Sequence, residues 1–549
     1  MFLDRSFNMI DYDKEYKEFK WDVPEYFNFA EAVVDKWAKR EKKLALWWVD
    51  DHGNEVRKTF REISHDSKRI ANALTAQGVK RNDVLLLIMP RNIEWWEVVT
   101  ACIRMGVVVA PGIAQLTVKD LKDRCRAANA TCIVTNHEVA AKFEQVADEC
   151  PCVKTRIVIS GKREGWLCYD DIKSAASKKF KKVNTRADDD CLLYFTSGTS
   201  GPSKMVIHTH ASYPIGHQVT GKYWLDLKPE DIVFNVSETG WAKAAWSSYF
   251  APWSMGAAIF VHYEAHQFNP TKALKLLSEY PITVFCGAPT VYRMFVVEEM
   301  LTRYQFPSLR HCVAAGEPLS PEIIQVWELA TGCVIRNGYG QTETVLLCGS
   351  FPAIELKPGS LGKPAPGIEL AVIDEDGNIL APQTEGFIAV KTAPQRPVGL
   401  FSKYWQAPDQ TRETFRKGWY LTGDRAYMDE DGYFWFVGRT DDVIITSGYR
   451  IGPHEVESAL MQHPAVAESA VVSSPDKTRG EIAKAFVITA PGFEPSDALA
   501  LELQEFVKKV TAPYKYPREI EFLDAMPKTI SGKIRRVDLR NREWDKVIK

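Results

Sequence analysis

The sequence predicts an α/β protein that has a large N-terminal domain of layered α/β sheets and a small α+β C-terminal domain. Three observations support this fold class. Short runs of β-branched residues alternate with helical patterns in the first part of the chain, as expected of sheets covered by helices. After about Lys357, tight turns such as "DEDG" between short strands predict a β-rich subdomain. Beyond Asp441, stretches such as "HEVESALMQHPAVAESAVV" predict further helices and strands.

The chain length requires more than one domain. At 549 residues it exceeds the ~250–300 residues at which a single hydrophobic core stops growing. The predicted division is an N-terminal domain at 1–440, with the β-rich subdomain at about 357–440, and a C-terminal domain at 441–549.

The elements of the large domain follow from local patterns. The segment "SHDSKRIANALTAQG" predicts a helix, because a polar start at Ser64 precedes apolar residues at helical spacing and Gly78 ends the pattern. The predicted strands, in chain order, are "VLLLIM", "TCIVT", "TRIVIS", "DIVFNV", "AAIFVHY", "ITVFCGAP" and "CVAAGEP".

Charge and cysteine usage exclude several classes of protein. The 69 basic and 71 acidic residues give a net charge of −2, so no overall basic field would collect nucleic acid. The eleven cysteines are scattered, and the pair Cys150 and Cys152 lacks a second pair to complete a zinc site. Reduced thiols are expected.

No apolar run reaches the ~18–20 residues of a membrane span, and the first residues match no secretory signal or transit peptide, so a cytoplasmic location is predicted.

A loop rich in glycine and hydroxyl groups precedes one lysine in "YFTSGTSGPSKM", residues 194–205. Glycines allow backbone N–H groups to face an anion, and the lysine adds a positive charge, so the stretch indicates phosphate binding. The spacing differs from that of the Walker loop, because Ser203 stands where that motif has glycine. Taken alone, a stretch of this composition is more often an ordinary turn.

Four later stretches resolve this ambiguity: "AAGEPLSPE", "NGYGQTET", "YLTGDRAYMDEDGYFWFVGRTDDVIITSGYRIGPHEVE" and "PKTISGKIRR". Together with the loop they resemble the adenylate-forming superfamily, which contains the AMP-forming acyl-CoA synthetases, the luciferases and the adenylation domains of peptide synthetases. The resemblance covers residues 28–536 and keeps the family's order of motifs. It implies a reaction in which ATP and Mg²⁺ convert a carboxylic acid into an acyl adenylate.

The resemblance implies a role for each matching residue in ATP binding. The loop would cradle the β- and γ-phosphates, and "GPSK" departs from the family's usual "GxPK" only in the place of its proline. Gly316, Glu317 and Pro318 would line the adenine, Tyr339 would stack on it, and Gly338, Gly340 and Gln341 flank this aromatic residue. The phosphate-loop residues are Thr196, Ser197, Gly198, Thr199, Ser200, Gly201 and Lys204.

Further residues are matched to phosphate, metal and ribose. Thr342 would contact the α-phosphate and Glu343 would ligate Mg²⁺, a cation that prefers oxygen ligands. Asp424 would bind the ribose hydroxyls with help from Arg439, and Arg450 would contact phosphate. The predicted catalytic set is Lys533, Glu343, Thr342 and Lys204.

The resemblance also implies two half-reactions at one site. Lys533 of the mobile C-terminal domain would stabilise the charge that develops during adenylation, an effect of ~10²–10³ in rate for one donor. Rotation about a hinge at Asp441 would then exchange this lysine for the "TSGYR" loop, beside which coenzyme A attacks the adenylate. The predicted coenzyme A contacts are Ser447, Gly448, Tyr449, Arg479, Lys508 and Tyr516.

The motifs look most like those of the medium-chain acyl-CoA synthetases. The acetate-specific branch has a tryptophan where this chain has Gly340, so an acid larger than acetate is expected, whether medium-chain, branched or aromatic. A tryptophan placed at 340 is expected to shorten the acyl pocket and to spare the nucleotide site. The predicted pocket residues are Trp241, Lys243, Trp246, Cys286, Val291, Tyr339 and Gly340.

Alternatives remain open from the sequence. An adenylation domain that loads a carrier protein would share every nucleotide motif, and a luciferase-like oxidase is not excluded by them. A non-catalytic nucleotide sensor is the non-enzymatic alternative, against which the intact Glu343, Lys204 and Lys533 argue. His208 and His210 have the spacing of a two-ligand metal site but no third ligand. The pair Trp95 and Trp96 is interpreted as core. The protein is expected to be a monomer or a homodimer.

Overall fold

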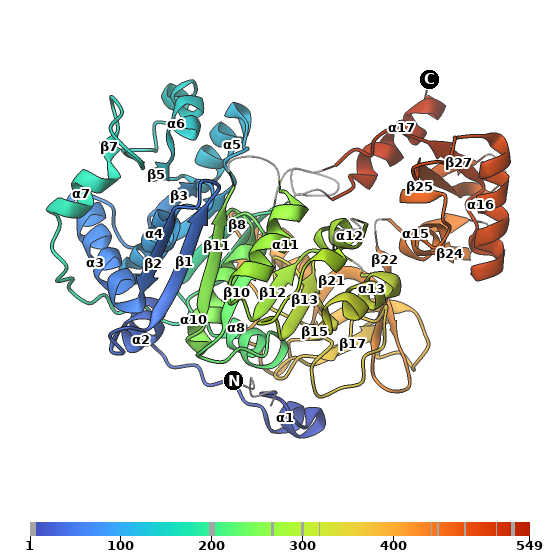
Figure 1. The fold of residues 1–549 in the computed structure, drawn as a ribbon, viewed down its shortest axis with the longest axis horizontal. Coiled ribbons are helices and arrows are strands. Elements are labelled where there is room, and N and C mark those ends of the chain that lie inside the picture. Colours follow the sequence, from blue (N-terminus) through green and yellow to red (C-terminus); the bar gives the residue numbers. More distant parts are fainter. Residues whose placement is uncertain are drawn as a thin grey trace. The chain divides into compact units, whose positions relative to one another are not determined.

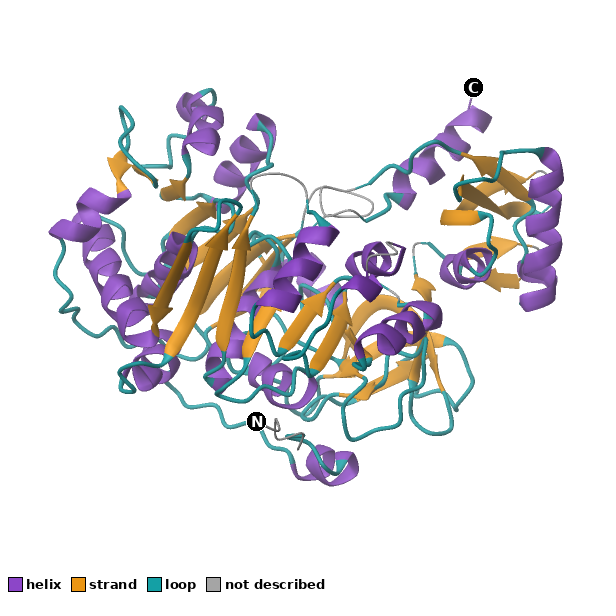
Figure 2. Cartoon of the chain, in the orientation of Figure 1, coloured by secondary structure: helices purple, strands orange, loops and turns teal. Residues whose placement is uncertain are grey.

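The computed structural model describes residues 7–196, 204–264, 268–297, 301–317, 319–440, 442–446, 449–476, 479–511, 513–528 and 533–548. The chain forms two compact units (Figure 1). The first contains most of the chain up to Glu369 together with Ala393–Glu413, and the second contains Leu370–Thr392 and Thr414–Lys549. Strands and helices are mixed in both, as the predicted α/β class requires (Figure 2). The predicted hinge at Asp441 lies outside the described residues.

The first unit holds a sheet that has nine strands among the described residues. Its central strands are parallel, so the carboxyl ends of β12, β13 and β14 lie at one edge. The strand order is β16 (Lys363–Pro364), β15 (Cys348–Gly349), β14 (Ile335–Tyr339), β13 (His311–Ala315), β12 (Val284–Gly287), β10 (Ile232–Asn235), β11 (Ala258–Tyr263), β1 (Leu44–Asp50) and β2 (Glu55–Thr59).

A second sheet of this unit has eight strands within the described ranges. The parallel strands β3, β5 and β6 carry runs that the sequence predicted, β4 pairs with β3, and β8 and β9 form an antiparallel pair at the predicted phosphate loop. The order is β19 (Lys403–Tyr404), β9 (Met205–Thr209), β8 (Asp190–Phe195), β4 (Val108–Gly112), β3 (Val84–Ile88), β5 (Cys132–Thr135), β6 (Thr155–Val158) and β7 (Leu167–Cys168).

Helix α3 (Phe60–Ala76) shows how local sequence sets an element's bounds. It begins four residues before the predicted start at Ser64, because Thr59 and Glu62 form a reciprocal capping box. It ends before Gly78, whose φ of +84° suits glycine. The other helices of this unit are α1 (Tyr12–Glu18), η1 (Ala30–Asp35), α2 (Lys36–Ala38), α4 (Ile93–Met105), α5 (Val118–Ala128), α6 (His137–Glu144), η2 (Ala147–Glu149), α7 (Tyr169–Ala175), α8 (Gly216–Val219), η3 (Thr220–Trp224), α9 (Ala242–Ala245), η4 (Trp246–Phe250), α10 (Ala251–Met255), α11 (Pro270–Glu279), α12 (Pro289–Val297), η5 (Leu301–Arg303) and α13 (Pro321–Thr331), while α14 (Pro408–Thr414) ends at the boundary of the units.

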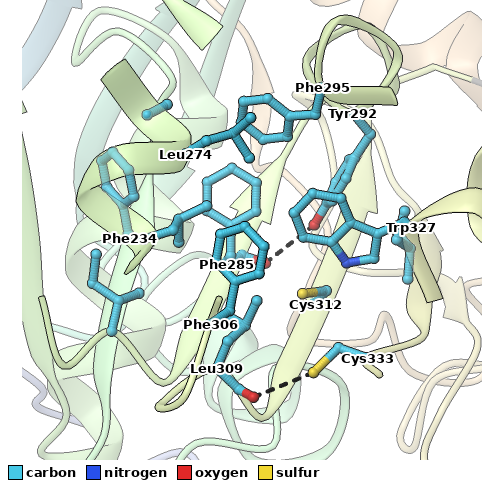
Figure 3. Close-up of a cluster of buried hydrophobic side chains, with 14 of the residues drawn as sticks. Phe234, Leu274, Phe285, Tyr292, Phe295, Phe306, Leu309, Cys312, Trp327 and Cys333 are labelled. Atoms are coloured by element: carbon cyan, nitrogen blue, oxygen red, sulfur yellow. Dashed lines mark hydrogen bonds between the residues drawn. The ribbon is translucent and has the colours of Figure 1, made fainter. Parts of the chain in front are cut away.

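An aromatic core packs on the nine-stranded sheet (Figure 3). Trp327 on α13 is fully buried, with its ring centre 5.7 Å from that of Phe295 and 5.1 Å from that of Tyr292. Such rings each bury a large apolar area, so this cluster is a main source of the unit's stability. Trp95 and Trp96 are each 1% exposed, which confirms their interpretation as core.

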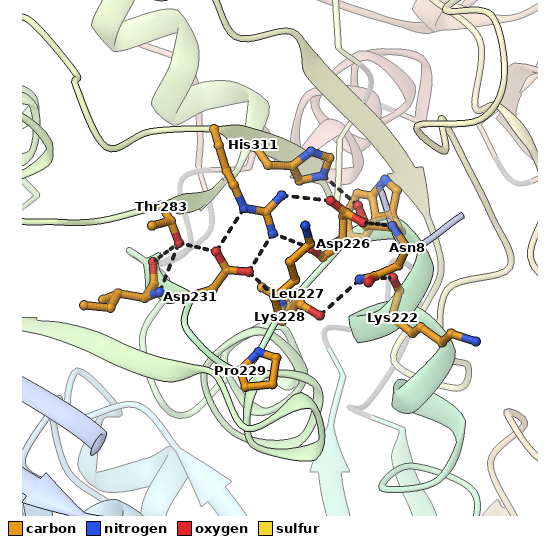
Figure 4. Close-up of polar contacts among 12 residues, drawn as sticks. Asn8, Lys222, Asp226, Leu227, Lys228, Pro229, Asp231, Thr283 and His311 are labelled. Carbon is orange, nitrogen blue, oxygen red and sulfur yellow. Dashed lines mark hydrogen bonds and ion pairs between the residues drawn. The ribbon is translucent and has the colours of Figure 1, made fainter. Parts of the chain in front are cut away.

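A buried network of charges joins the loops before β10 and β13 (Figure 4). The guanidinium of Arg310 donates to the Asp226 carboxylate at 2.8 Å and to both oxygens of Asp231 at 2.9 and 2.6 Å. Asp226 also accepts from the Asn8 amide N–H, and Asp231 accepts from the Thr283 hydroxyl. The network therefore ties four segments of the chain together at the ends of the central strands.

The second unit combines the β-rich segment with the C-terminal elements. Its sheets contain β17 (Leu370–Ile373), β18 (Gly386–Lys391), β20 (Phe415–Arg416), β21 (Trp419–Met428) and β22 (Phe434–Arg439), then β23 (Ile444–Thr446) with β24 (Tyr449–Ile451), then β25 (Val466–Asp476), β26 (Gly480–Thr489) and β27 (Glu519–Phe522). Its helices are α15 (Pro453–Met461), α16 (Asp497–Val510), η6 (Pro513–Lys515) and α17 (Arg536–Ile548).

Within the described ranges, we find no helix that combines the length and the apolar character needed to cross a membrane.

Candidate active site

The candidate site of the first unit lies where strands of both sheets end. In α/β sheets, ligands bind outside the carboxyl ends of the strands, because the loops that follow converge there. Gly316 and Glu317 follow β13, and the segment 339–343 begins at the end of the neighbouring strand β14. The predicted adenine and α-phosphate residues are thus adjacent in the sheet order.

The predicted phosphate loop connects β8 to β9. Thr196 and Lys204 close this hairpin, because the Thr196 amide N–H donates to the Lys204 carbonyl at 2.9 Å. The Nζ atom of Lys204 lies 5.3 Å from the centre of the Tyr404 ring. The predicted phosphate-loop residues Ser197, Gly198, Thr199, Ser200 and Gly201 lie outside the described residues, and the same holds for Pro318, Ser447 and Gly448.

Two side chains that the sequence reading assigned to no role here hold the Thr342–Glu343 turn. The Tyr404 hydroxyl donates to the Glu343 carboxylate at 2.9 Å, and the ring of His208 bonds the Thr342 carbonyl at 2.7 Å. The Phe401 amide N–H also donates to the Glu343 carbonyl at 2.7 Å. Three hydrogen bonds therefore hold the turn, one from β9, one from β19 and one from Phe401, which precedes β19.

Glu343 fits the expected role as a ligand of Mg²⁺. Its side chain is half-buried and presents a carboxylate oxygen, the donor type that Mg²⁺ prefers. Tyr404 donates to one oxygen of this carboxylate, Oε1, and so orients the group. In nucleotide enzymes Mg²⁺ usually takes one or two protein carboxylates and fills its other positions with phosphate oxygens and water, which suits such a site.

The predicted adenine segment has a specific backbone requirement. Gly316 has a φ of +102°, in the region that favours glycine, so a side chain there would strain the turn after β13. The next residue, Glu317, accepts a hydrogen bond from the Thr290 hydroxyl at 2.7 Å. Glu317 is therefore tied to α12, and Tyr339 stands at the end of the adjacent strand β14.

Gly340 is needed for close approach of the backbone. A Cβ atom at this position would lie only 2.5 Å from the carbonyl oxygen of Val345. This contact is shorter than real Cβ atoms make, and the obstacle is backbone, which cannot swing aside. The structure adds a second expected effect of a tryptophan at 340, because its Cβ atom would require the backbone at Val345 to shift. The effect on the depth of the acyl pocket stays a prediction.

We expect Gly340→Ala to lower kcat/KM by roughly tenfold or more for small and large acids alike. The new Cβ atom overlaps the Val345 carbonyl oxygen at a cost of ~1–3 kcal/mol, and the Thr342–Glu343 turn is expected to shift as the overlap is relieved. The measurement is kcat/KM for acetate and hexanoate at saturating ATP. Gly438→Ala is the matched control, since a Cβ atom there would meet its nearest neighbours at 3.5 Å and 3.6 Å, which is ordinary contact. A selective loss of hexanoate activity would instead support control of pocket depth by Gly340.

The predicted acyl-site residues fall into separate groups. The Lys243 ammonium donates to the Ala315 carbonyl at 3.0 Å, and it lies close enough to the buried thiol of Cys286 to act on its pKa. Burial raises that pKa, and Lys243 and Ser247 oppose the rise. These contacts bring Lys243 and Cys286 together beside the end of β13.

The other acyl candidates have different surroundings. Trp246 stacks on His217 with 6.0 Å between ring centres and lies 5.8 Å from the buried Trp224. Trp241 packs against the core of the eight-stranded sheet, whereas Val291 packs against the core of the nine-stranded sheet. A shared wall formed by all of these residues stays a prediction.

Two predicted ribose contacts pair with each other in the second unit. Asp424 and Arg439 face one another across β21 and β22, with Nε of Arg439 3.5 Å from Oδ1 of Asp424. The carboxylate is buried and the arginine side chain is 46% exposed. Asp424 thus has a cation beside it, as buried carboxylates in proteins usually do.

The predicted coenzyme A residues lie on several elements of the second unit. Lys508 and Tyr516 contact each other, with Nζ 4.2 Å from the ring centre, whereas exposed Arg479 stands in the turn before β26. Tyr449 and Arg450 form part of β24. Lys533 is exposed between residue 528 and α17, and its role stays a prediction.

Sequence reasoning missed Tyr404, His208 and Trp224. The partner of Tyr404 is 61 residues away and that of His208 is 134 residues away, so no local pattern could reveal them. Trp224 packs against Gly338, where a Cβ atom would lie 2.3 Å from the indole. The glycine at 338 in "NGYG" was the sequence feature that could have indicated this close contact.

Comparisons with known proteins agree with this arrangement. The family model described as AMP-binding enzyme matches residues 33–405, and that described as AMP-binding enzyme C-terminal domain matches residues 455–533. Acyl-coenzyme A synthetase ACSM3, mitochondrial, from Rattus norvegicus is 49% identical over 547 residues, which cover 98% of this chain and 94% of that protein. Acyl-coenzyme A synthetase ACSM4, mitochondrial, from Homo sapiens is 50% identical over 532 residues, or 95% of this chain and 91% of that protein.

Solved structures give the same result for the fold. The crystal structure of the anthranilate CoA ligase AuaEII in complex with anthranoyl-AMP matches with a TM-score of 0.88 and 29% identity, and covers 96% of this chain and 99% of that one. A benzoate CoA ligase from Burkholderia xenovorans LB400 matches with a TM-score of 0.82 and 29% identity, over 94% of this chain and all of that one. The predicted fold class is confirmed. The chain therefore belongs to the AMP-binding enzyme family, and within it to the AMP-forming acyl-coenzyme A synthetases of the adenylate-forming superfamily, on their medium-chain branch.

Proposed function

We propose that this protein is an acid–thiol ligase that activates a carboxylic acid larger than acetate. The acid reacts with ATP to give an acyl adenylate and pyrophosphate, and the thiol of coenzyme A then attacks the adenylate and releases AMP. Direct attack on the acid is blocked because hydroxide is a poor leaving group, whereas AMP is a good one. Mg²⁺, when bound, neutralises charge on the phosphates.

One observation carries the proposal: Lys204 and Glu343 meet at Tyr404 at the edge of the phosphate loop. A cation that contacts phosphates and a carboxylate suited to Mg²⁺ are the two groups that ATP chemistry requires side by side. Identity of about one half to acyl-coenzyme A synthetases over nearly the whole chain supports the same reaction.

We assign the remaining roles from the sequence motifs. Thr342 contacts the α-phosphate, Asp424 and Arg439 bind the ribose, and Lys533 stabilises the charge of adenylation. Asp441 is the hinge between the half-reactions. The predicted pocket around Trp246 and Cys286 receives the acyl chain, and nearby apolar groups such as Trp224 support an acid with several carbons.

A panel of acids tests the substrate class. Each buried methylene contributes ~0.8 kcal/mol, so four extra carbons should raise kcat/KM roughly a hundredfold over acetate. The measurement is pyrophosphate release and thioester formation for acetate, butyrate, hexanoate, 2-methylbutyrate and benzoate, with and without coenzyme A.

Two results would contradict the proposal. Preference for acetate would remove the assignment to larger acids. Acid-dependent pyrophosphate release without any thioester in the presence of coenzyme A would favour a domain that loads a carrier protein, and absence of pyrophosphate release with every acid would favour a nucleotide sensor.

A cytoplasmic location is part of the proposal. All eleven cysteines have free thiols, as expected in a reducing compartment. The relatives from Rattus norvegicus and Homo sapiens carry the word mitochondrial in their names. Fractionation of the source cells, followed by immunodetection, distinguishes the two compartments.

A further inference from the structure

His208 occupies a buried position between the phosphate-loop hairpin and the Thr342–Glu343 turn. It lies on β9, four residues after Lys204, and is 0% exposed. Its Nε2 atom is 2.7 Å from the Thr342 carbonyl oxygen, and its Nδ1 atom is 3.1 Å from the Ser212 hydroxyl. The ring also packs on Tyr213, with 4.5 Å between centres.

The direction of this hydrogen bond follows from its chemistry. A carbonyl oxygen can only accept, so Nε2 of His208 carries the proton and donates to Thr342. Nδ1 is then free to accept from the Ser212 hydroxyl. Burial lowers the pKa of His208 to about 3, so the ring is neutral and keeps one defined tautomer.

The bond connects two parts of the nucleotide site that are remote in sequence. Strand β9 starts directly after Lys204, and its edge is covered by β19, which carries Tyr404. Tyr404 in turn donates to Glu343. The turn is consequently held at its carboxylate by one side chain and at its backbone by another, and both come from the same pair of strands.

We infer that His208 is a positioning residue, which fixes the Thr342 backbone relative to Lys204 so that the α-phosphate and metal contacts are in place before ATP binds. This inference rests on the proposed function, because it assigns Thr342 and Glu343 to the nucleotide. Outer groups that orient the residues in contact with a ligand typically affect affinity or activity by roughly 10-fold to 100-fold when they are replaced.

His210 provides a matched control on the same strand. It is also 0% exposed, and burial lowers its pKa to about 4. Within the described part of the chain, neither of its ring nitrogens has a hydrogen-bond partner. Replacement of His210 therefore removes an equally buried imidazole without removing a bond to the site.

The experiment compares His208→Phe, His208→Gln and His210→Phe in the full-length protein. Phenylalanine keeps a ring but cannot donate, whereas the glutamine amide nitrogen reaches nearly as far as Nε2 and can donate to Thr342. The first measurement is the affinity for AMP by calorimetry, without acid or coenzyme A. The second is kcat and the half-saturating Mg²⁺ concentration for acid-dependent ATP–pyrophosphate exchange.

We expect His208→Phe to weaken AMP binding and to lower kcat by roughly 10-fold to 100-fold, with a raised Mg²⁺ requirement. His208→Gln should restore most of both, and His210→Phe should leave AMP affinity and Mg²⁺ requirement unchanged. Loss of folded protein alone would lower the active fraction, but it would leave the AMP affinity and the half-saturating Mg²⁺ concentration unchanged.

Three outcomes overturn the inference. The first is an AMP affinity of His208→Phe equal to that of the wild type. The second is a folded His208→Gln that is as defective as His208→Phe, and the third is the same loss of AMP affinity in His210→Phe. If both phenylalanine variants fail to fold, His208→Gln against His208→Leu makes the same comparison. Failure of the proposed function is distinguishable, because the wild type itself would then release no pyrophosphate with any acid.

Discussion

Replacement of Lys533 by alanine should lower the rate of adenylation by ~10²–10³, because the ammonium no longer stabilises the charge that develops between the carboxylate and the α-phosphate. The same variant should convert supplied acyl adenylate and coenzyme A into thioester at the wild-type rate. The measurement is single-turnover kinetics of each half-reaction, with hexanoate and ATP for the first and hexanoyl-AMP for the second.

The informative result is a loss of rate in adenylation with no loss of rate in thioester formation. Lys528→Ala serves as a control, since Lys528 is part of the same C-terminal segment and pairs with Glu468 at 2.9 Å. An equal fall of both half-reactions in Lys533→Ala would rule out the assignment of this lysine to adenylation alone.

Arg310→Leu should destabilise the first unit by about 3–5 kcal/mol, because it leaves two buried carboxylates without their cation. The side chain of Asp226 is 0% exposed and that of Asp231 is 3% exposed. The expected observation is a large fall in the urea midpoint of unfolding. Arg412→Leu should leave the midpoint nearly unchanged, because its ion pair with Asp409 is exposed and such pairs contribute at most ~1 kcal/mol.

The defect in Arg310→Leu should depend on pH in a defined direction. Burial raises the pKa of Asp226 even in the intact network, where Arg310 opposes the rise. Without Arg310 the folded-state pKa increases further, so the folded protein binds a proton that the unfolded chain releases. Stability of the variant relative to the wild type should then improve as pH falls from 8 toward 5. If the loss of stability of Arg310→Leu relative to the wild type is the same at every pH in this range, then lost packing, and not buried charge, is the cause.

The fold class could be predicted because its signals are local. Apolar runs such as "VLLLIM" became β3, and the alternation with helices indicated layered sheets. The start of α3 was placed four residues late, since the capping box of Thr59 and Glu62 extends the helix beyond its apolar pattern. Strand pairing over long distances, such as β19 with β9, has no signal within either segment.

Motifs predicted the residues of the candidate site, but they did not predict the residues that hold the site in place. Lys204, Thr342 and Glu343 stand in recognisable stretches, whereas His208 looked like half of an incomplete metal site. Its real neighbour is a backbone carbonyl, which any residue type supplies, so the sequence around Thr342 carries no mark of the contact. The sequence analysis explained Gly340 by the room that a missing side chain leaves for the acyl chain. In the structure, the Val345 carbonyl oxygen lies where a Cβ atom at 340 would make too close a contact.

The pairing of β19 with β9 has a consequence for synthesis of the protein. Residues 403–404 complete a sheet edge that begins at residue 205, so a nascent chain exposes the unpaired edge of β9 while about two hundred further residues are made. Unpaired edges rich in apolar residues invite association with other chains. The β8–β9 hairpin can pair on its own, but the outer edge of β9 stays open to other chains until residues 403–404 have been made and can pair with it.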